Sequence, residues 1–271
     1  MNGLKIGDIV ARKSYGGDVF FTIEKVLDSR DDSKKYVLRG LHQRLLADSH
    51  PDDLIKKDSR EVMYKIQRST AFLKRQAHLR NFPSKFLSLR YNSRPGTILH
   101  IDSSGDFMQR CISQYKESGI KCYGVQADES EQPYRVARLL EQYRPDILVV
   151  TGHDALKKDS ANIHSIDNYW HSKYFIQSVT EARKYEADKN KLCIFAGACQ
   201  SYYEAIMNAG ANFASSPGRI LINALDPAMV AEKVALTDYR KVVTQYDVAR
   251  ITVSGSKGIG GITTKGRLTW V

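Results

Sequence analysis

Two short stretches of the chain combine the residue types that a thiol-dependent hydrolase needs. Thr151-Gly152-His153-Asp154 follows one apolar run, and Gly197-Ala198-Cys199-Gln200-Ser201 follows another. A thiol beside an imidazole can act as a nucleophile with its general base. The glycine just before each group lets the backbone turn sharply and lets a substrate approach closely. These stretches predict Cys199 as a nucleophile and His153 as its base.

The order of the two groups along the chain excludes several families of mechanism. All seven histidines lie at or before His171, so none follows Cys199. Papain-like proteases and class I glutaminases place the histidine after the cysteine, and α/β-hydrolases place it last. A histidine followed by a cysteine roughly 50 residues later is the order and spacing of caspase-like enzymes.

Alternating apolar and amphipathic segments would position these residues. Apolar runs predict five strands, at residues 97–102, 120–127, 146–154, 192–201 and 219–225. Amphipathic patterns predict helices after them, at residues 106–118, 134–143, 170–187, 202–210 and 227–236. This alternation indicates a mostly parallel sheet with helices on both faces. Ligands bind such sheets at the carboxyl ends of the strands, where Asp102, His153 and Cys199 fall.

The remaining segments have a different character. Residues 4–57 read as short strands with tight turns, which suggests a five-stranded SH3/KOW-like barrel or a looser β-meander. Residues 60–94 predict an amphipathic basic helix that ends near Pro83. The glycine-rich tail, 253–270, reads as a terminal hairpin without a dinucleotide or P-loop motif. The expected organisation is a barrel at 1–59, a helical linker at 60–95 and a caspase-like α/β peptidase domain at 96–271.

Composition and charge exclude further classes. With 42% hydrophobic and 26% charged residues, the chain is neither fibrous nor disordered. The net charge of +11 is concentrated between Arg60 and Arg94, a segment that contains nine basic residues and one acidic residue. A general nucleic-acid surface is therefore disfavoured. Four cysteines are too few for a disulfide framework. No apolar run approaches the roughly 18 residues of a membrane span, and the first residues lack a signal-peptide pattern.

Several stretches resemble the YabG sporulation-specific protease family, within the caspase-like cysteine peptidases. They are KIGDIVARKSYGGDVFF, YRPDILVVTGHDAL, FAGACQSYYEAI, GANFASSPGRILINALDP and GSKGIGGI, and the resemblance extends over nearly the whole chain. The resemblance implies a protease that processes spore coat proteins in the mother cell and the forming spore. It also implies a preference for cutting after basic residues, notably arginine.

The resemblance implies further site residues. In caspase-like peptidases the backbone N–H after the histidine and that of the cysteine form the oxyanion hole, here Asp154 and Cys199. Several arginine-specific relatives carry an acid where this chain has Gly197, so an acid for the S1 pocket must come from elsewhere. Asp102 is the most attractive candidate because a carboxylate pairs well with a guanidinium, although it also suits a helix N-cap. Weaker candidates are Glu129, Glu131 and Asp226.

The remaining histidines and cysteines are weaker candidates for the site. His100 is an alternative base at the end of the first predicted strand, and His164 and His171 lack a third ligand for a metal. We expect Cys111, Cys122 and Cys193 to be core residues, and no cofactor or metal. The alternative function is a non-enzymatic nucleic-acid- or scaffold-binding protein using the barrel and the basic helix. If the chain is a protease that cuts after basic residues, we expect self-cleavage between about residues 75 and 95.

Overall fold

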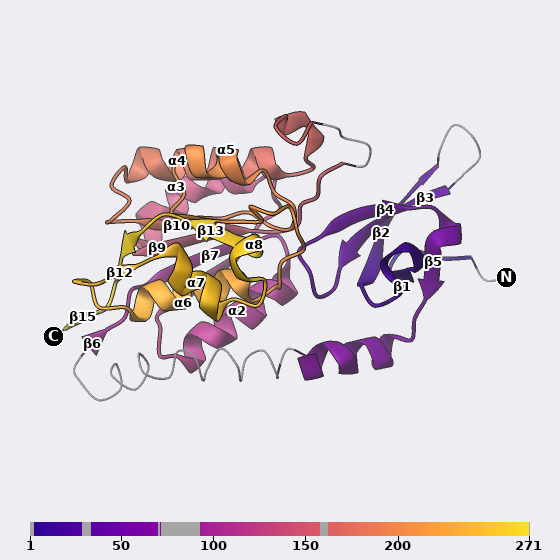
Figure 1. Cartoon of the computed structure of the whole chain (residues 1–271), viewed down its shortest axis with the longest axis horizontal. Coiled ribbons are helices and arrows are strands. Elements are labelled where there is room, and N and C mark those ends of the chain that lie inside the picture. The colour runs from indigo at the N-terminus through magenta and orange to yellow at the C-terminus, as the bar shows by residue number, and fades with distance from the viewer. Residues whose placement is uncertain (1–2, 29–33, 70, 72–92, 158–161, 271) are drawn as a thin grey trace.

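A computed structural model describes residues 3–28, 34–69, 71, 93–157 and 162–270 (Figure 1). The strands are β1 (Ile9–Arg12), β2 (Phe20–Asp28), β3 (Lys34–Gly40), β4 (Leu46–Ser49), β5 (Leu54–Lys56), β6 (Ser93–Arg94), β7 (Ile98–Asp102), β8 (Cys122–Gln126), β9 (Ile147–Thr151), β10 (Cys193–Ala196), β11 (Phe213–Ser215), β12 (Val242–Val243), β13 (Ile259–Gly261), β14 (Thr264–Lys265) and β15 (Thr269–Trp270). The helices are α2 (Gly105–Glu117), α3 (Gln132–Tyr143), α4 (Ser172–Tyr185), α5 (Tyr203–Asn208), α6 (Asp226–Leu236), α7 (Gln245–Ile251) and α8 (Gly255–Gly258). Short 3-10 turns cover Lys13–Tyr15, Pro51–Asp53 and Ile166–Asn168.

The larger sheet has six strands in the order β13-β11-β10-β9-β7-β8. The strands β8, β7, β9, β10 and β11 run parallel to their neighbours, and β13 pairs antiparallel with β11. The carboxyl ends of the parallel strands therefore meet at one edge of the sheet. Because β9 and β10 are neighbours, the loops that carry His153 and Cys199 leave this edge side by side.

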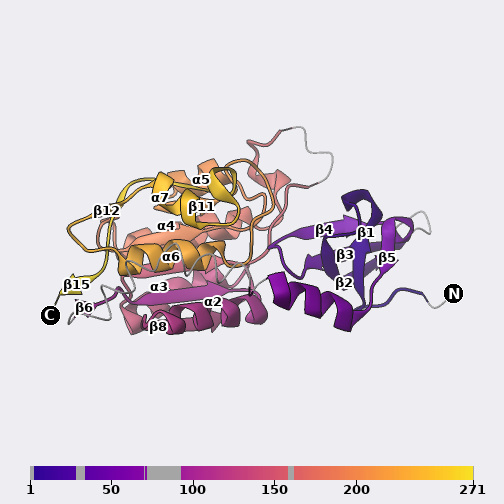
Figure 2. The same ribbon diagram turned by 60° about the horizontal axis from the view of Figure 1, so that its bottom comes forward.

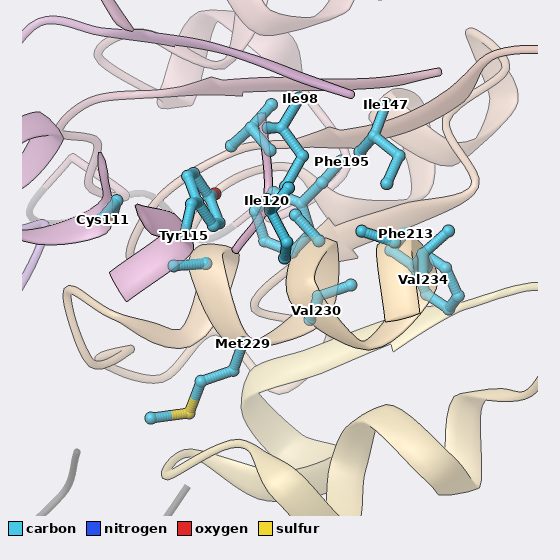
Figure 3. Close-up of a cluster of buried hydrophobic side chains, with 14 of the residues drawn as sticks. Ile98, Cys111, Tyr115, Ile120, Ile147, Phe195, Phe213, Met229, Val230 and Val234 are labelled. Atoms are coloured by element: carbon cyan, nitrogen blue, oxygen red, sulfur yellow. The ribbon is translucent and has the colours of Figure 1, made fainter. Parts of the chain in front are cut away.

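Helices cover both faces of this sheet, as predicted (Figure 1). Alternate strand residues point to opposite faces. Ile147 and Val149 pack on the side of α2, α6 and α7, whereas Leu148 and Val150 pack on the side of α3, α4 and α5. Figure 3 shows the first cluster, in which strand side chains such as Phe195 face α6. The near-continuous apolar strands are thus explained by burial on both faces.

The N-terminal strands form a separate antiparallel sheet in the order β4-β3-β2-β1-β5, beside the larger one (Figure 2). The number of strands agrees with the predicted barrel. Its closure is not confirmed, because no pairing joins β4 to β5 in the part of the chain that the structure describes. Residues 59–69 are helical, as the basic pattern predicts, and the rest of that predicted helix lies outside the described residues.

Two predicted elements were wrong. Residues 219–225 are not the fifth strand; that place belongs to β11, and the chain leaves the sheet at Ser216 and Arg219, where φ is 63° and 53°. Residues 222–225 of this apolar run are buried instead near the strand ends, where Ile222 packs in one cluster with Cys199 and with residues of the N-terminal half of the molecule (residues 3–69). The tail is not a hairpin either, because β13, β14 and β15 pair with β11, β12 and β6.

Candidate active site

The predicted nucleophile and base both lie at the carboxyl edge of the larger sheet, and both are fully buried. Cys199 packs in an apolar cluster with Phe21, Leu38 and Leu45 of the N-terminal half. Its Sγ accepts a hydrogen bond from the backbone N–H of Ile222, at 3.2 Å. The predicted site is therefore covered by the N-terminal sheet.

A carbonyl group occupies the predicted oxyanion hole. The backbone N–H groups of Asp154 and Cys199 both donate to the carbonyl oxygen of Arg44, each at 3.2 Å. Two amides converging on one oxygen is the geometry expected for binding a scissile carbonyl. The structure thus brings together the two amides that the sequence suggested, around a group supplied by the loop between β3 and β4.

The side chain of Arg44 fills a closed pocket and is fully buried. Its Nη1 donates to Asp102 Oδ2 at 2.7 Å, and its Nη2 donates to the Ala224 carbonyl at 3.0 Å. The guanidinium carbon lies 5.0 Å from the centre of the Phe107 ring, and Nη2 lies 3.8 Å from Cys111 Sγ. A carboxylate, a carbonyl and an aromatic face are the partners a buried guanidinium needs.

Asp102 is the acidic residue of this pocket. Burial would raise the pKa of its carboxyl, but the charge of Arg44 and a contact with His100 hold it below the usual range. His100 is buried, with Nδ1 3.0 Å from the Tyr115 hydroxyl and Nε2 3.4 Å from Asp102. His100 thus orients the acid. Asp102 is not the N-cap of α2, because Ser104 accepts the N–H of Phe107 there.

Asp154 connects the two loops through its side chain. Its fully buried carboxylate accepts hydrogen bonds from the backbone N–H of His171 and from the hydroxyls of Ser172 and Ser201. Ser201 Oγ in turn accepts the N–H of Ala198, at 2.9 Å. Burial raises the pKa of Asp154 despite these donors. The residue after His153 therefore fixes the loop that carries Cys199, a role its sequence position alone does not reveal.

His153 is held from both halves of the molecule. Its backbone N–H donates to Glu129 Oε1 at 2.7 Å, an approach that only glycine permits at position 152, since a Cβ there would lie 2.4 Å from that oxygen. Its ring stacks on Phe107, and Nδ1 lies 3.0 Å from Arg39 Nη1. A guanidinium only donates, so Nδ1 accepts and the proton of the neutral ring is on Nε2.

The protonation states follow from burial. Burial raises the pKa of the Cys199 thiol to about 12, although the backbone amides of Ile222 and Arg44 favour the thiolate. Burial and the charge of Arg39 lower the pKa of His153 to about 3. His153 Nε2 has no hydrogen-bond partner in the described residues. Thiol and imidazole are thus both neutral and are not hydrogen-bonded to one another.

The other candidates lie elsewhere. Glu131 is exposed and pairs with Arg135, whereas Asp226 is buried and accepts the backbone N–H groups of Val253, Ser254 and Asn223. Glu129 contacts His153 and His171 rather than Arg44. His164 is exposed and belongs to no metal-binding group within the described residues. Cys111 and Cys193 are buried core residues, and Cys122 is half-buried.

The sequence interpretation missed both arginines from the N-terminal half, Arg39 and Arg44. The only local signal was an arginine inside a leucine-rich turn, LHQRLL, at residues 41–46. Gly197 could have been explained from its conformation: its φ of 105° favours glycine, so an acid at that position would be strained.

An open cleft of about 460 Å³ lies beside the covered site. It is bounded by β2 and β3 on one side and by residues 128–130 and 170–174 on the other. Arg39, Leu46, Glu129 and His171 are among its walls. Since Arg39 and Glu129 both contact His153, the buried imidazole lies directly beneath this cleft.

Comparisons with known proteins agree with the predicted class. A family model described as YabG peptidase U57 matches residues 5–271. The sporulation-specific protease YabG of Bacillus subtilis (strain 168) is 39% identical over an alignment that is 278 residues long. The alignment includes 97% of this chain and 96% of that protein. No solved structure matches the chain.

The chain is therefore a peptidase built on an α/β fold. It belongs to the YabG peptidase U57 family, as the sequence resemblance implied. The non-enzymatic alternative is not favoured by these matches. None of the helices in the described ranges is long and apolar enough to cross a bilayer.

Proposed function

We propose that the chain is a cysteine endopeptidase that cuts after arginine. The observation that carries this proposal is the binding of Arg44. Its carbonyl oxygen accepts from the amides of Cys199 and Asp154, while its guanidinium pairs with Asp102. One residue thus occupies an oxyanion hole and an acidic pocket at once, as the residue before a scissile bond would.

In this mechanism Cys199 Sγ attacks the carbonyl carbon held by the two amides, and its proton passes to His153. The developing oxyanion is stabilised by the amides of Cys199 and Asp154. His153 then gives the proton to the departing amine, and water hydrolyses the thioester. Asp154 and Ser201 keep the two loops in register, so the amides converge before the reaction begins.

Asp102 is the acid of the S1 pocket in this proposal. Its distance of 2.7 Å to Arg44 Nη1 and the carbonyl of Ala224 on Nη2 suit a guanidinium better than an ammonium group. Glu131 and Asp226 have no contact with Arg44 among the described residues, so we do not assign them to the pocket.

The wider setting is part of the same proposal. We assign a caspase-like fold to residues 96–271, an SH3/KOW-like unit to residues 1–59 and a helical linker to residues 60–95. By its likeness to the sporulation-specific protease YabG of Bacillus subtilis, we infer that the chain processes spore coat and other sporulation proteins. It would act in the mother cell and at the spore coat.

The test is a digest of a peptide library with the purified protein, which identifies the residue before each cut. We expect arginine there. Cys199→Ala and His153→Ala should each lower turnover by about 10⁴-fold or more, because the pair acts as a unit. Cys122→Ala, at a half-buried thiol outside the site, is the matched control and should keep its activity. Near-normal turnover in either folded site variant would contradict the assignment.

A further inference from the structure

The loop between β3 and β4 lies in the site as a peptide substrate would. Gln43 pairs antiparallel with Asn223, and Leu45 pairs in parallel with Asp154. The N–H of Leu46 also donates to the carbonyl of Asp154, at 3.3 Å. The backbone is therefore held on both sides of Arg44, in addition to the contacts of Arg44 itself.

The loop is also fixed at its base. The N–H of Gly40 donates to the carbonyl of Leu45 at 2.9 Å, which closes a tight turn. Position 40 needs glycine because a Cβ there would lie 2.4 Å from the carbonyl oxygen of Gln43. The N-terminal sheet thus holds Arg44 in a single register against the amides of Asp154 and Cys199.

We propose that the Arg44–Leu45 peptide bond is a cleavage site for the chain's own peptidase, and that residues 40–46 keep the site occupied until that bond is cut. The inference rests on the proposed function, since it uses the same nucleophile, amides and pocket. The expectation of self-cleavage at residues 75–95 stays a separate prediction, because most of those residues lie outside the described residues.

The step is an ordinary hydrolysis. Cys199 Sγ bonds to the carbonyl carbon of Arg44, and the thiol proton goes to His153. The bond to the nitrogen of Leu45 breaks, and that nitrogen takes the proton from His153 and leaves as an amine. One water then adds its oxygen to the thioester carbon, which releases the Arg44 carboxylic acid and returns a proton to the sulfur.

The contacts of the uncut chain make this reaction slow to begin. Arg39 donates to His153 Nδ1, and Nε2 carries the ring proton, so neither nitrogen is free to take the proton of Cys199. Arg39 is also paired with Glu24 and is 27% exposed at its side chain, so water can compete for it. Loss of the Arg39 contact would free the base.

The basic residues of the helical segment are worse substrates because of their conformation. Arg60, Lys65 and Arg68 lie in the helical segment 59–69, whereas a cleaved chain must be extended in the site. After the cut, β4 remains paired with β3 and β5 with β1. The two fragments should therefore stay together under native conditions and separate only in denaturant.

The test follows the purified chain by intact mass and N-terminal sequencing under denaturing conditions, with a fluorogenic arginine peptide as a parallel substrate. We expect fragments 1–44 and 45–271, formed at a rate that dilution does not change. Peptide hydrolysis should rise as the Leu45 terminus accumulates. Cys199→Ala should give no such terminus.

Variants of the loop sharpen the test. Arg44→Gln should slow this cut by about 100-fold or more, since the pocket acid loses its cation. Arg44→Lys keeps the positive charge, so this variant should still be cut, although more slowly than the parent chain. Cleavage of the lysine variant would show that a substitution at position 44 does not by itself prevent folding. Arg60→Gln, on the exposed helix, should be cut like the parent chain.

The outcomes separate the two proposals. If the protein hydrolyses the arginine peptide but no Leu45 terminus forms, the inference is wrong and the proposed function stands. If it cuts neither peptide nor itself, the proposed function fails and the inference fails with it. A Leu45 terminus in Cys199→Ala would reveal another protease, and full peptide activity before any cut would overturn the blocking role of the loop.

Discussion

The two halves of the molecule hold the site with different kinds of contact. Within the larger half (93–270), buried carboxylates accept N–H and O–H donors of the same half, as Asp154 does from Ser172 and Ser201. Between the halves, the side-chain hydrogen bonds to His153 and Asp102 come from two arginines, Arg39 and Arg44. The first set can persist whatever occupies the site, whereas the second depends on the docked loop.

This difference indicates which charged group a substrate must bring to the site. Asp102 and Arg44 are both fully buried and neutralise one another. Removing one partner of a buried ion pair leaves an uncompensated charge, at a cost of about 3–5 kcal/mol. A peptide that replaces the loop must therefore bring its own cation to Asp102, which is the physical basis of the proposed arginine preference.

Among the contacts that join the two halves, we expect the largest effect from Asp102, which pairs with Arg44. Asp102→Asn should lower kcat/KM for arginine peptides by roughly 10²–10³-fold, because a truncated buried charge pair costs about 2–5 kcal/mol. Hydrolysis of glutamine peptides should change far less. Steady-state kinetics on peptides that differ only in the residue before the cut measure this selectivity.

Asp226→Asn is the matched control. Asp226 is equally buried, but within the described residues its carboxylate accepts hydrogen bonds from donors of its own half, the backbone N–H groups of Val253, Ser254 and Asn223 among them. The ratio of arginine to glutamine hydrolysis should therefore remain that of the parent enzyme. An unchanged ratio in Asp102→Asn, or an equal loss in Asp226→Asn, would place the specificity acid elsewhere.

The halves also differ in how far the sequence predicted them. The strands β7, β8, β9 and β10 followed from local patterns, because burial on both faces demands continuous apolar runs, whereas β11 was not predicted. Residues 219–225 are apolar for another reason, because residues 222–225 are buried near the strand ends, where the N–H of Ile222 donates to Cys199 Sγ. An apolar run indicates that a segment is buried but not what it packs against, so residues 219–225 were wrongly predicted to be a strand of the sheet.

The candidate site was predictable only where it is local. Asp102 ends β7, and His153 and Cys199 lie two and three residues after the ends of β9 and β10. A strand end can be recognised from its sequence. Arg44 meets them from a different sheet, and its position depends on how the halves dock. No periodicity of the sequence encodes such a contact.

An intermediate effect is expected from His153, which the two halves share. Its folded pKa is lowered to about 3 by burial and by Arg39, against about 6.5 in the unfolded chain. Between these values the unfolded chain binds a proton that the folded chain does not. The stability that neutral His153 contributes is therefore fully present above about pH 6.5 and is lost as the pH decreases. From about pH 6.5 to about pH 5 the loss is about 2 kcal/mol.

The measurement is denaturant unfolding of the uncut Cys199→Ala protein at both pH values. His42 and His100 also have pKa values lowered by burial, so the quantity of interest is a difference between variants. Cys199→Ala/His153→Gln should lose about 2 kcal/mol less over this interval. The same pH dependence in both proteins would mean that His153 is not the group that titrates.

The smallest expected effect tests the contacts that stay within the larger half. Ser201 Oγ donates to Asp154 and accepts the N–H of Ala198, each at 2.9 Å. Ser201→Ala should cost about 1–2 kcal/mol of unfolding free energy, because it leaves buried polar groups unpaired. Ser178→Ala is its control: that hydroxyl is buried on α4 without a hydrogen-bond partner among the described residues, so its removal should be neutral or stabilising. Denaturant unfolding of both in the Cys199→Ala background compares them, and an equal cost would show that Ser201 does not brace the two loops.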